Sequence, residues 1–567
     1  MVALHGKSCG RMLRFLIEPV AALSTCPMIW GVMWKYFPEN FSDDELEILS
    51  RYFTNVDKPV FALVNLPEVV KGALFARYSR SAKSLRRLFL DEFYDSSSSD
   101  GGSSAAGIER AEALYERMLA DYGDDSVAQL GGVHLACEQA SNILTKVLER
   151  GRLMAYLEQS TRYVPYDKKL ADGSFRYLVP EEIVEGGGEE SYRRYMDALF
   201  VEYTEVFELV QERLYATIEK DAADSDFIYR SSIRAVALDT ARGILPASVL
   251  SNVGIFGTAQ AYEALILRMR ASELKEVREY AELIKGELDK VIPAFLTRVD
   301  RPERGGVWVD YLSAQNRRAE IVLDEVSGGT PPDESGVTVR LIRFDPDGER
   351  RIAAAIIFEN SQASMRSAID KASSLTDGEL EILISSYVGE RQNRRHKPGR
   401  AFEETSYLFE IECDYGAFRD LQRHRMLSVE WQVLDTSLGY VVPELIEDLG
   451  FRERYAAKME SLKSFHDELA RAFGPRVSAY AVPMAYRIRF TMNLNAREAL
   501  HLIELRSSPQ GHSSYRAVAQ EMYSCIKTLA NHANVAAAMK FVDLGHYRLG
   551  RLSSLRHEER KNQRLSR

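Results

Sequence analysis

The sequence of 567 residues has few cysteines and none of the familiar catalytic or cofactor signatures. Its five cysteines are widely separated and form no CxxC pair. That distribution disfavours a disulfide framework and a structural zinc site, and it predicts a reducing, cytoplasmic location. The GxGxxG, HExxH and GxSxG patterns are also missing from the sequence. We therefore expect no metal at the functional site and no chemistry of the common zinc-protease or serine-hydrolase kinds.

The chain also lacks an excess of basic charge and an uninterrupted apolar span. Lys and Arg number 73 against 83 Asp and Glu, a net charge of −10, so no nucleic-acid partner is expected. The apolar run over residues 15–34 contains a glutamate and two prolines, which a membrane-spanning helix tolerates poorly. We expect no membrane insertion and interpret residues 1–45 as an N-terminal extension.

What remains is an ordinary globular composition, 46% hydrophobic and 28% charged, in a chain long enough for several domains. Residues 96–107 are rich in Ser and Gly, which predicts a flexible loop. Residues 324–336 contain two prolines and three glycines, which predict a linker. The Arg-rich residues 546–567 lose apolar periodicity after Leu555, which favours a solvated basic tail. We interpret the basic stretch 391–400 as a solvated loop, with phosphate contacts as the alternative.

The two sides of the linker look like copies of one domain. Arg150-Gly151-Arg152 and Arg423-His424-Arg425 each follow a similar mixed run, and a second pair of blocks brings Arg268 and Arg506 to matching places. Residues 407–412 and 486–494 predict strands, whereas residues 191–222, 259–291 and 452–473 predict helices. We expect two homologous α+β domains, residues 46–323 and 337–545, which pair as a pseudo-dimer.

Two short motifs contain the groups that bind phosphates and planar rings. The triplet at residues 423–425 offers two guanidiniums, which fork onto phosphates and stack on aromatic systems, and an imidazole. In the first half, Glu158, Ser160 and Arg162 alternate and would share one face of a strand. On a helix, Glu158 and Arg162 would instead form a simple i,i+4 ion pair. Spacing alone leaves both interpretations open.

Together these motifs resemble the flavin-dependent thymidylate synthases (ThyX), in which an RHR triplet and an E-x-S-x-R-Y segment are signatures. Residues 241–246 (ARGILP) resemble the ARxxLP of that family, and residues 495–506 resemble its N-x-R…LR helix. The resemblance covers most of both halves and implies a mixed helix and antiparallel-sheet fold. It also implies thymidylate synthesis from dUMP with FAD, NADPH and methylenetetrahydrofolate. A homotetramer in the family implies a homodimer, a pseudo-tetramer of four domains, for this tandem chain.

The two halves depart from the family pattern in opposite ways. The first half has Gly151 in place of the RHR histidine and lacks N-x-R, but it keeps Glu158, Ser160, Arg162 and Arg242. The second half has lost most of E-x-S-x-R-Y and has Ala479 at the position equivalent to Arg242 of the first half. It keeps Arg423, His424, Arg425, Asn495, Arg497 and Arg506. Complementary losses predict one composite site that joins a first-half domain to a second-half domain.

The resemblance also implies a role for each retained residue. Glu158, Ser160, Arg162 and Arg242 would bind the nucleotide, and Arg423, His424, Arg425, Asn495, Arg497 and His501 would bind FAD. Arg506 would be the catalytic group, stabilising negative charge on the uracil ring. Val147 and Asp420 replace a family glutamine that contacts the nucleotide, so a flavoenzyme acting on another pyrimidine nucleotide is an alternative. A catalytically silent nucleotide-binding protein is the third possibility.

Overall fold

The computed structural model covers both halves of the chain. The residues it describes are 36–66, 68–94, 133–222, 224–290, 296, 299–327, 338–547 and 549–565. The predicted loop at 96–107 and most of the predicted extension 1–45 lie outside them. Of the predicted linker, only residues 324–327 are described, and they end a helix rather than forming a loop.

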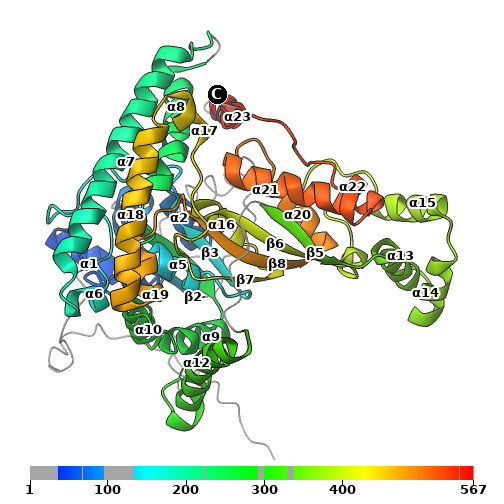
Figure 1. Ribbon diagram of the computed structural model, residues 1–567, viewed down its shortest axis with the longest axis horizontal. Helices are drawn as coiled ribbons and strands as arrows, with labels where there is room; N and C mark the ends of the chain where they lie inside the picture. Colours follow the sequence, from blue (N-terminus) through cyan, green and yellow to red (C-terminus); the bar gives the residue numbers. More distant parts are fainter. Residues whose placement is uncertain are drawn as a thin grey trace, which may run out of the picture. The chain divides into compact units, whose positions relative to one another are not determined.

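Each half contains a four-stranded antiparallel sheet, and the two sheets share one strand order. The orders are β1-β2-β4-β3 and β5-β6-β8-β7. The first sheet consists of β1 (Val60–Ala62), β2 (Val133–Ser141), β3 (Met154–Glu158) and β4 (Leu250–Gly257). The second consists of β5 (Val339–Phe344), β6 (Ser406–Asp414), β7 (Leu427–Trp431) and β8 (Arg487–Asn495). The predicted repeat and the α+β class are confirmed (Figure 1).

Helices surround both sheets (Figure 1). The first half contains α1 (Asp43–Ser50), α2 (Glu68–Tyr78), α3 (Leu85–Leu88), α5 (Asn142–Leu148), α6 (Glu181–Glu185), α7 (Glu189–Thr217), α8 (Asp226–Ala241), α9 (Ala259–Arg270), α10 (Lys275–Leu288) and α12 (Val307–Ser327). The second contains α13 (Gly348–Glu359), α14 (Met365–Ser373), α15 (Asp377–Val388), α16 (Tyr415–Gln422), α17 (Glu444–Asp448), α18 (Arg452–Phe473), α19 (Pro475–Ser478), α20 (Ala496–Arg506), α21 (Ser513–Ser524), α22 (Ala533–Ala538) and α23 (Leu552–Leu565). Among the described helices, none combines the length and apolarity needed to cross a bilayer.

Most of the expected elements are present, with one division. The strands predicted at 407–412 and 486–494 are β6 and β8, and the helix predicted at 452–473 is α18. The helix predicted at 191–222 is α7, which begins two residues earlier and ends at Thr217. The helix predicted at 259–291 is divided into α9 and α10, because the chain turns after Arg270.

Strand β8 shows how the sheet positions side chains on two sides. Its residues alternate between buried and partly exposed, the period of two that a half-buried strand requires. Phe490 and Met492 are almost fully buried, and each such side chain contributes about 1.5–3 kcal/mol. Asn493 and Asn495 alternate with them and face a cavity instead. One face of the strand therefore stabilises the fold, and the other lines a site.

The two halves meet about an internal pseudo-two-fold axis. Pro246 of the first half and Pro483 of the second, which occupy equivalent places in the repeat, form an antiparallel bridge. The backbone N–H of Ala247 donates to the Val482 carbonyl at 2.8 Å, and that of Met484 donates to the Leu245 carbonyl at 2.9 Å. The donor and acceptor of one hydrogen bond are the counterparts, in the other half, of the donor and acceptor of the second. The halves therefore pair as a pseudo-dimer.

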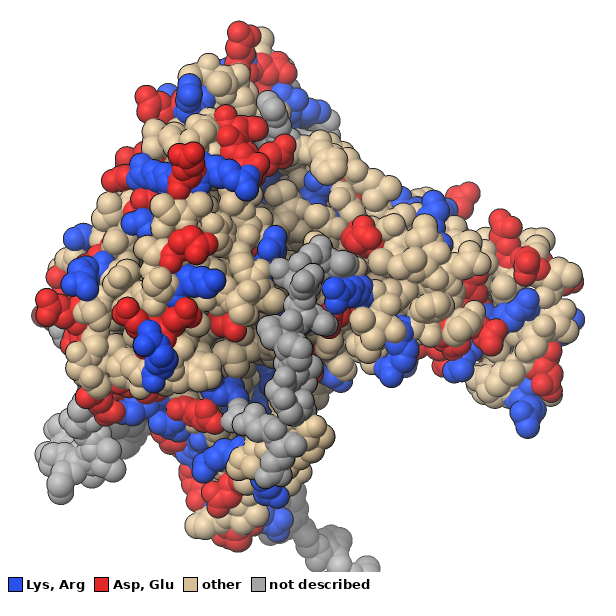
Figure 2. Space-filling view, in the orientation of Figure 1, with Lys and Arg blue, Asp and Glu red and all other residues tan. Residues whose placement is uncertain are grey.

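The long helices α7 and α18, equivalent in the repeat, also pack together. The rings of Tyr195 and Phe465 stack with centroids 3.9 Å apart. Arg454 of α18 donates to Glu202 of α7 at 2.7 Å. Over these helices acidic and basic side chains are interspersed, and neither sign of charge forms a large patch on this face (Figure 2).

Candidate functional site

A cavity of about 1640 Å³ lies where the first and second halves meet. Strand β3 and the turn after it line one side, and the segment after α16, the start of β7 and helix α20 line the other. Ten of the residues predicted from sequence line it: Glu158, Ser160, Arg162, Arg423, His424, Arg425, Asn495, Arg497, His501 and Arg506. The cavity thus brings together the two residue sets that the halves retain separately.

Positive charge dominates this cavity. Twelve Lys or Arg side chains line it, against four Asp or Glu. Its volume exceeds that of a typical pocket for one drug-sized ligand, which is roughly 300–1,000 Å³. A cavity of this size and charge fits anionic ligands that carry phosphates, and it has room for two ring systems.

Glu158 connects the halves through a buried ion pair. Its carboxylate accepts a hydrogen bond from Arg419 of α16 at 2.6 Å and lies 3.4 Å from the Lys146 ammonium. Burial alone would raise the pKa of Glu158, but attraction to Arg419 and Lys146 lowers it. Glu158 ends β3 and pairs across the halves, so neither the strand-face nor the i,i+4 interpretation of Glu158 and Arg162 is correct.

Arg162 lies in the turn after β3 and is held by residues far away in the sequence. Its guanidinium forms a two-point pair with Asp239 of α8, at 2.8 and 2.7 Å. It also donates to the Tyr515 hydroxyl of α21 at 2.7 Å. Burial opposes the charge of Asp239, yet Arg162 and Arg551 hold the pKa of that carboxyl well below its usual range. Arg162 is therefore fixed in orientation at the cavity wall, near Ser160.

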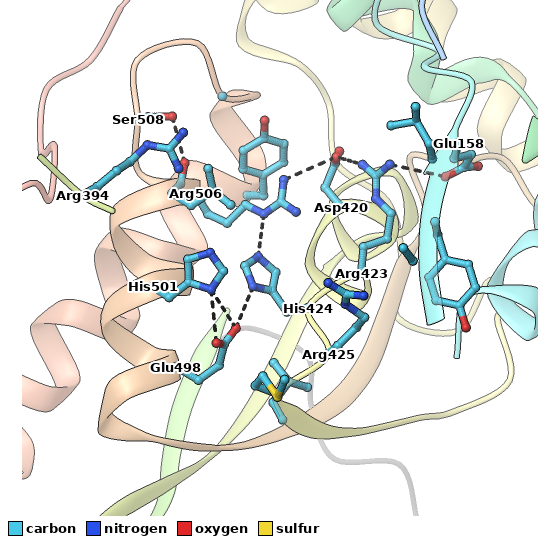
Figure 3. A pocket seen from close by; sticks show the side chains of 18 of the residues that line it. Glu158, Arg394, Asp420, Arg423, His424, Arg425, Glu498, His501, Arg506 and Ser508 are labelled. Carbon is cyan, nitrogen blue, oxygen red and sulfur yellow. Dashed lines mark hydrogen bonds and ion pairs between the residues drawn. The ribbon is translucent and has the colours of Figure 1, made fainter. Parts of the chain in front are cut away.

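His424, Arg506 and Glu498 form a chain of hydrogen bonds within the second half (Figure 3). Arg506 Nε donates to His424 Nε2 at 3.0 Å, and His424 Nδ1 lies 2.9 Å from Glu498. Because an arginine Nε–H only donates, His424 Nε2 is an acceptor and its proton resides on Nδ1. Burial, with the nearby Arg506 charge, lowers the pKa of His424 to about 4. His424 is therefore neutral and fixes the orientation of Arg506.

Asp420 lies among several guanidiniums (Figure 3). It pairs with Arg423 at 2.5 Å and lies 3.7 Å from Arg506 and 3.6 Å from Arg242. Burial disfavours its charge, but these arginines hold its pKa well below the usual range. Arg242 is the one predicted site residue outside the cavity lining; it is buried behind Asp420. The structure therefore places Arg242 as a partner of Asp420 rather than at the cavity surface.

The remaining predicted residues have identifiable partners. Arg425 donates to the Met154 carbonyl of β3 at 2.5 Å, another contact between the halves. The Asn495 side chain caps α20 by accepting from the Glu498 N–H at 2.9 Å. Arg497 donates to the Pro398 carbonyl at 2.8 Å. Asn495 thus has a structural role in addition to lining the cavity.

Two groups of cavity residues lie outside the predicted site residues. Most of the stretch at 391–400 is exposed, as predicted, but Asn393, Arg394, Arg395, Lys397 and Arg400 also line the cavity, and Arg391 forms a buried pair with Glu504 at 2.6 Å. Part of the tail differs from the predicted solvated segment, because Arg551, Ser554 and Leu555 line the cavity and α23 begins at Leu552. The arginine enrichment of both segments was a signal, but its partners lie far away in the sequence.

His424, Glu498 and His501 have ligand atoms within 4.8 Å of one another, the spacing of a metal site. Their hydrogen bonds already connect them: Glu498 lies 2.9 Å from His424 and 3.2 Å from His501. Burial would raise the pKa of Glu498, but these hydrogen bonds hold it well below the usual range. The surrounding arginines also disfavour a further cation. That no metal binds here stays a prediction.

The counterpart of His424 in the first half is Gly151, and the arginines on either side of it contact the second half. Arg150 pairs with Glu430 at 2.8 Å, and Arg152 donates to Ser428 at 2.8 Å. A Cβ at Gly151, the counterpart of His424, would lie 2.5 Å from the Tyr156 hydroxyl. A histidine at this position would therefore meet Tyr156, which itself lines the cavity.

Comparison with known proteins agrees with this architecture. The model of the family described as thymidylate synthase complementing protein matches residues 73–294 and 340–530, once in each half. The chain belongs to this family. The resemblance to ThyX is thus confirmed at the family level.

Two proteins are similar to this chain over nearly their whole length. A UPF0159 protein of Chlamydia muridarum is 38% identical over 521 residues, which are 90% of this chain and 97% of that protein. A UPF0159 protein of Thermoplasma acidophilum is 33% identical, over 87% of this chain and 98% of that one. A flavin-dependent thymidylate synthase of Clostridium tetani is 25% identical over 180 residues, 32% of this chain and 67% of that enzyme.

Solved structures of two related enzymes match part of the chain. A UMP/dUMP methylase PolB from Streptomyces cacaoi is 19% identical and covers 36% of this chain and 96% of its own, with a TM-score of 0.30. A ThyX from Helicobacter pylori, solved with FAD and dUMP, is 19% identical and covers 36% of this chain and 100% of its own, with a TM-score of 0.26.

Proposed function

We propose that the protein is an FAD-dependent thymidylate synthase that methylates dUMP at C5, with methylenetetrahydrofolate and NADPH, at one composite site in each chain. The main support is the cavity between the halves, where Glu158, Ser160 and Arg162 of one half meet Arg423–Arg425 and Arg506 of the other. Neither half supplies both sets. A chain that kept complementary residues would need such a joint site to work.

The donor set of the cavity fits a flavin dinucleotide and a nucleotide monophosphate. The guanidiniums of Arg423 and Arg425 and the imidazole of His424 suit a planar ring with phosphates. Asn495, Arg497 and His501 extend this wall toward the basic stretch at 391–400. A bound flavin would supply the redox chemistry there. Ser160 and Arg162 would hold the phosphate of dUMP on the opposite wall.

In this proposal Arg506 provides the electrostatic catalysis. His424 and Asp420 hold its guanidinium from two sides, at 3.0 and 3.7 Å, so its direction is set before a ligand arrives. A fixed guanidinium at the uracil ring would stabilise negative charge and make C5 nucleophilic. The described cysteines, Cys137, Cys413 and Cys525, are buried away from the cavity. None of them is placed to act as a covalent nucleophile.

An activity assay tests the proposal. The protein is incubated with FAD, desalted, and supplied with dUMP, methylenetetrahydrofolate and NADPH, and thymidylate is measured by mass spectrometry. We expect thymidylate from the wild type, and a rate lower by about 10²- to 10³-fold from Arg506→Gln. Arg454→Gln, a change of the same kind on the distant helix α18, serves as the matched control. Flavin retention without thymidylate would contradict dUMP as the substrate, and failure to retain flavin would contradict a flavoenzyme.

A second candidate keeps the flavin and changes the nucleotide. Asp420 stands where the family has a glutamine that contacts the nucleotide, and it lines the cavity with its carboxylate ionised. An ionised carboxylate only accepts hydrogen bonds, whereas a glutamine amide also donates. This difference favours a base with a donor where uracil has an acceptor, as the amino group of cytosine replaces the O4 of uracil. Parallel assays with UMP, dUMP and dCMP distinguish the two candidates.

A further inference from the structure

The C-terminal segment reaches the cavity although it lies beyond the residues that the family model matches. That match ends at residue 530. Arg551, Ser554 and Leu555 nevertheless line the cavity, at the start of helix α23. A segment outside the shared family core thus contributes a buried guanidinium to the wall of the site.

Ion pairs with the first half anchor this segment. Arg556 of α23 pairs with Asp224 at 2.5 Å and with Asp221 at 2.9 Å, just before helix α8. The partner carboxylate of Asp224 is almost fully buried, and this pair opposes its protonation by lowering its pKa. The tail of the second half therefore crosses to the first half, and its position over α8 is fixed by charge.

Arg551 shares its partner with Arg162. Arg551 Nη2 donates to both oxygens of Asp239, at 3.0 and 3.2 Å, and Nη1 donates to the Arg162 carbonyl at 3.0 Å. Arg162 pairs with the same Asp239 carboxylate. One carboxylate thus neutralises only one of two guanidiniums, and this wall keeps an excess positive charge next to Ser160.

The donors of Arg551 are not exhausted by these contacts. A guanidinium has five N–H donors in a planar fork. Among the described residues, none accepts from its Nε–H, while Nη1 and Nη2 make the bonds given above. Its side chain is about one-tenth exposed and lines the cavity. A phosphate monoester dianion is the ligand that two adjacent guanidiniums and a serine hydroxyl bind best.

We infer that Arg551 is a phosphate-binding residue of the nucleotide site, so that the C-terminal helix α23 forms a fixed part of that site. The inference rests on the proposed nucleotide substrate and adds to it a residue outside the family core. Arg551 acts beside Arg162 on one phosphate, and the shared partner Asp239 holds both guanidiniums next to each other. Ligands without a phosphate gain nothing from Arg551.

Calorimetric titration of the full chain with dUMP and with deoxyuridine tests the inference. We expect Arg551→Gln to weaken dUMP binding by about 10- to 100-fold, the effect of removing one charge-assisted contact, and to leave deoxyuridine binding unchanged. Arg551→Lys keeps the charge without the fork and should recover part of the loss. Arg560→Gln is the matched control, because Arg560 is an exposed arginine of the same helix and does not line the cavity.

Hydrogen exchange of the wild type adds a measurement that needs no variant. Exchange of residues 549–565 should slow on adding dUMP and stay unchanged with deoxyuridine. Equal dUMP affinity of Arg551→Gln and wild type, equal weakening of both ligands, or no preference of the wild type for dUMP would each overturn the inference. If dUMP binding depends on Arg551 but no thymidylate forms, the proposed activity fails and the phosphate assignment stands.

Discussion

Replacing Glu158 with Gln should destabilise the protein, because it breaks a buried ion pair between the two halves. The Glu158 side chain is 2% exposed and that of Arg419 is 6% exposed. Water therefore cannot solvate either charge when its partner is removed. Lys146 keeps Glu149 as a partner at 2.5 Å, but Arg419 is left without a carboxylate. Removing one partner of a buried pair costs about 3–5 kcal/mol. We expect a loss near 3 kcal/mol in unfolding free energy, since Gln retains a hydrogen-bond acceptor.

Urea unfolding followed by tryptophan fluorescence measures this loss. Glu205→Gln is the matched control: Glu205 also pairs across the halves, with Arg454, but its side chain is 50% exposed. An exposed pair contributes about 1 kcal/mol or less. Adding Arg419→Gln to Glu158→Gln should recover much of the loss, because the uncompensated charge is removed. If Glu158→Gln unfolds within about 0.5 kcal/mol of the wild type, the buried pair does not join the halves as described.

Three further predictions follow from the site. Because the folded pKa of His424 is lowered to about 4 from a usual 6.5, stability is full above pH 6.5 and is lost as pH falls toward 4. His424→Gln should remove roughly 3 kcal/mol of that pH dependence, and an unchanged dependence in urea unfolding would argue against a buried neutral imidazole. Arg162→Gln and Arg425→Gln, each inactive alone, should give no activity when mixed; recovered activity would mean that sites span two chains. Gly151→His should lower stability by about 1–3 kcal/mol through its clash with Tyr156, and bound flavin per chain should not rise above the wild-type value.

Local patterns in the sequence were sufficient to predict two of the strands, β6 and β8, and several long helices. The period-two alternation of β8 and the helical run of α18 depend on neighbouring residues, so both were predictable. The motif residues were predictable because they match the signatures of the ThyX family. Ten of them do line one cavity.

Long-range contacts account for what the sequence did not reveal. Arg551 reaches Asp239 across more than half the chain, and no local periodicity encodes that pairing. The composition of the Arg-rich stretch at 391–400 is typical of a solvated loop, and only the fold reveals that Arg391 pairs with Glu504 in the interior. Arg242 was predicted to bind phosphate, but Asp420 of the other half lies between it and the cavity. Each of these differences arises from an ion pair between distant segments.

The number of flavins bound per chain tests the central proposal most directly. The protein is saturated with FAD, desalted, and its visible absorption is compared with protein concentration, before and after reduction and anaerobic titration with dUMP. One composite site per chain predicts one FAD and one dUMP per chain, with the flavin spectrum changed by dUMP. Two flavins per chain, or none, would contradict a single site built jointly by the two halves.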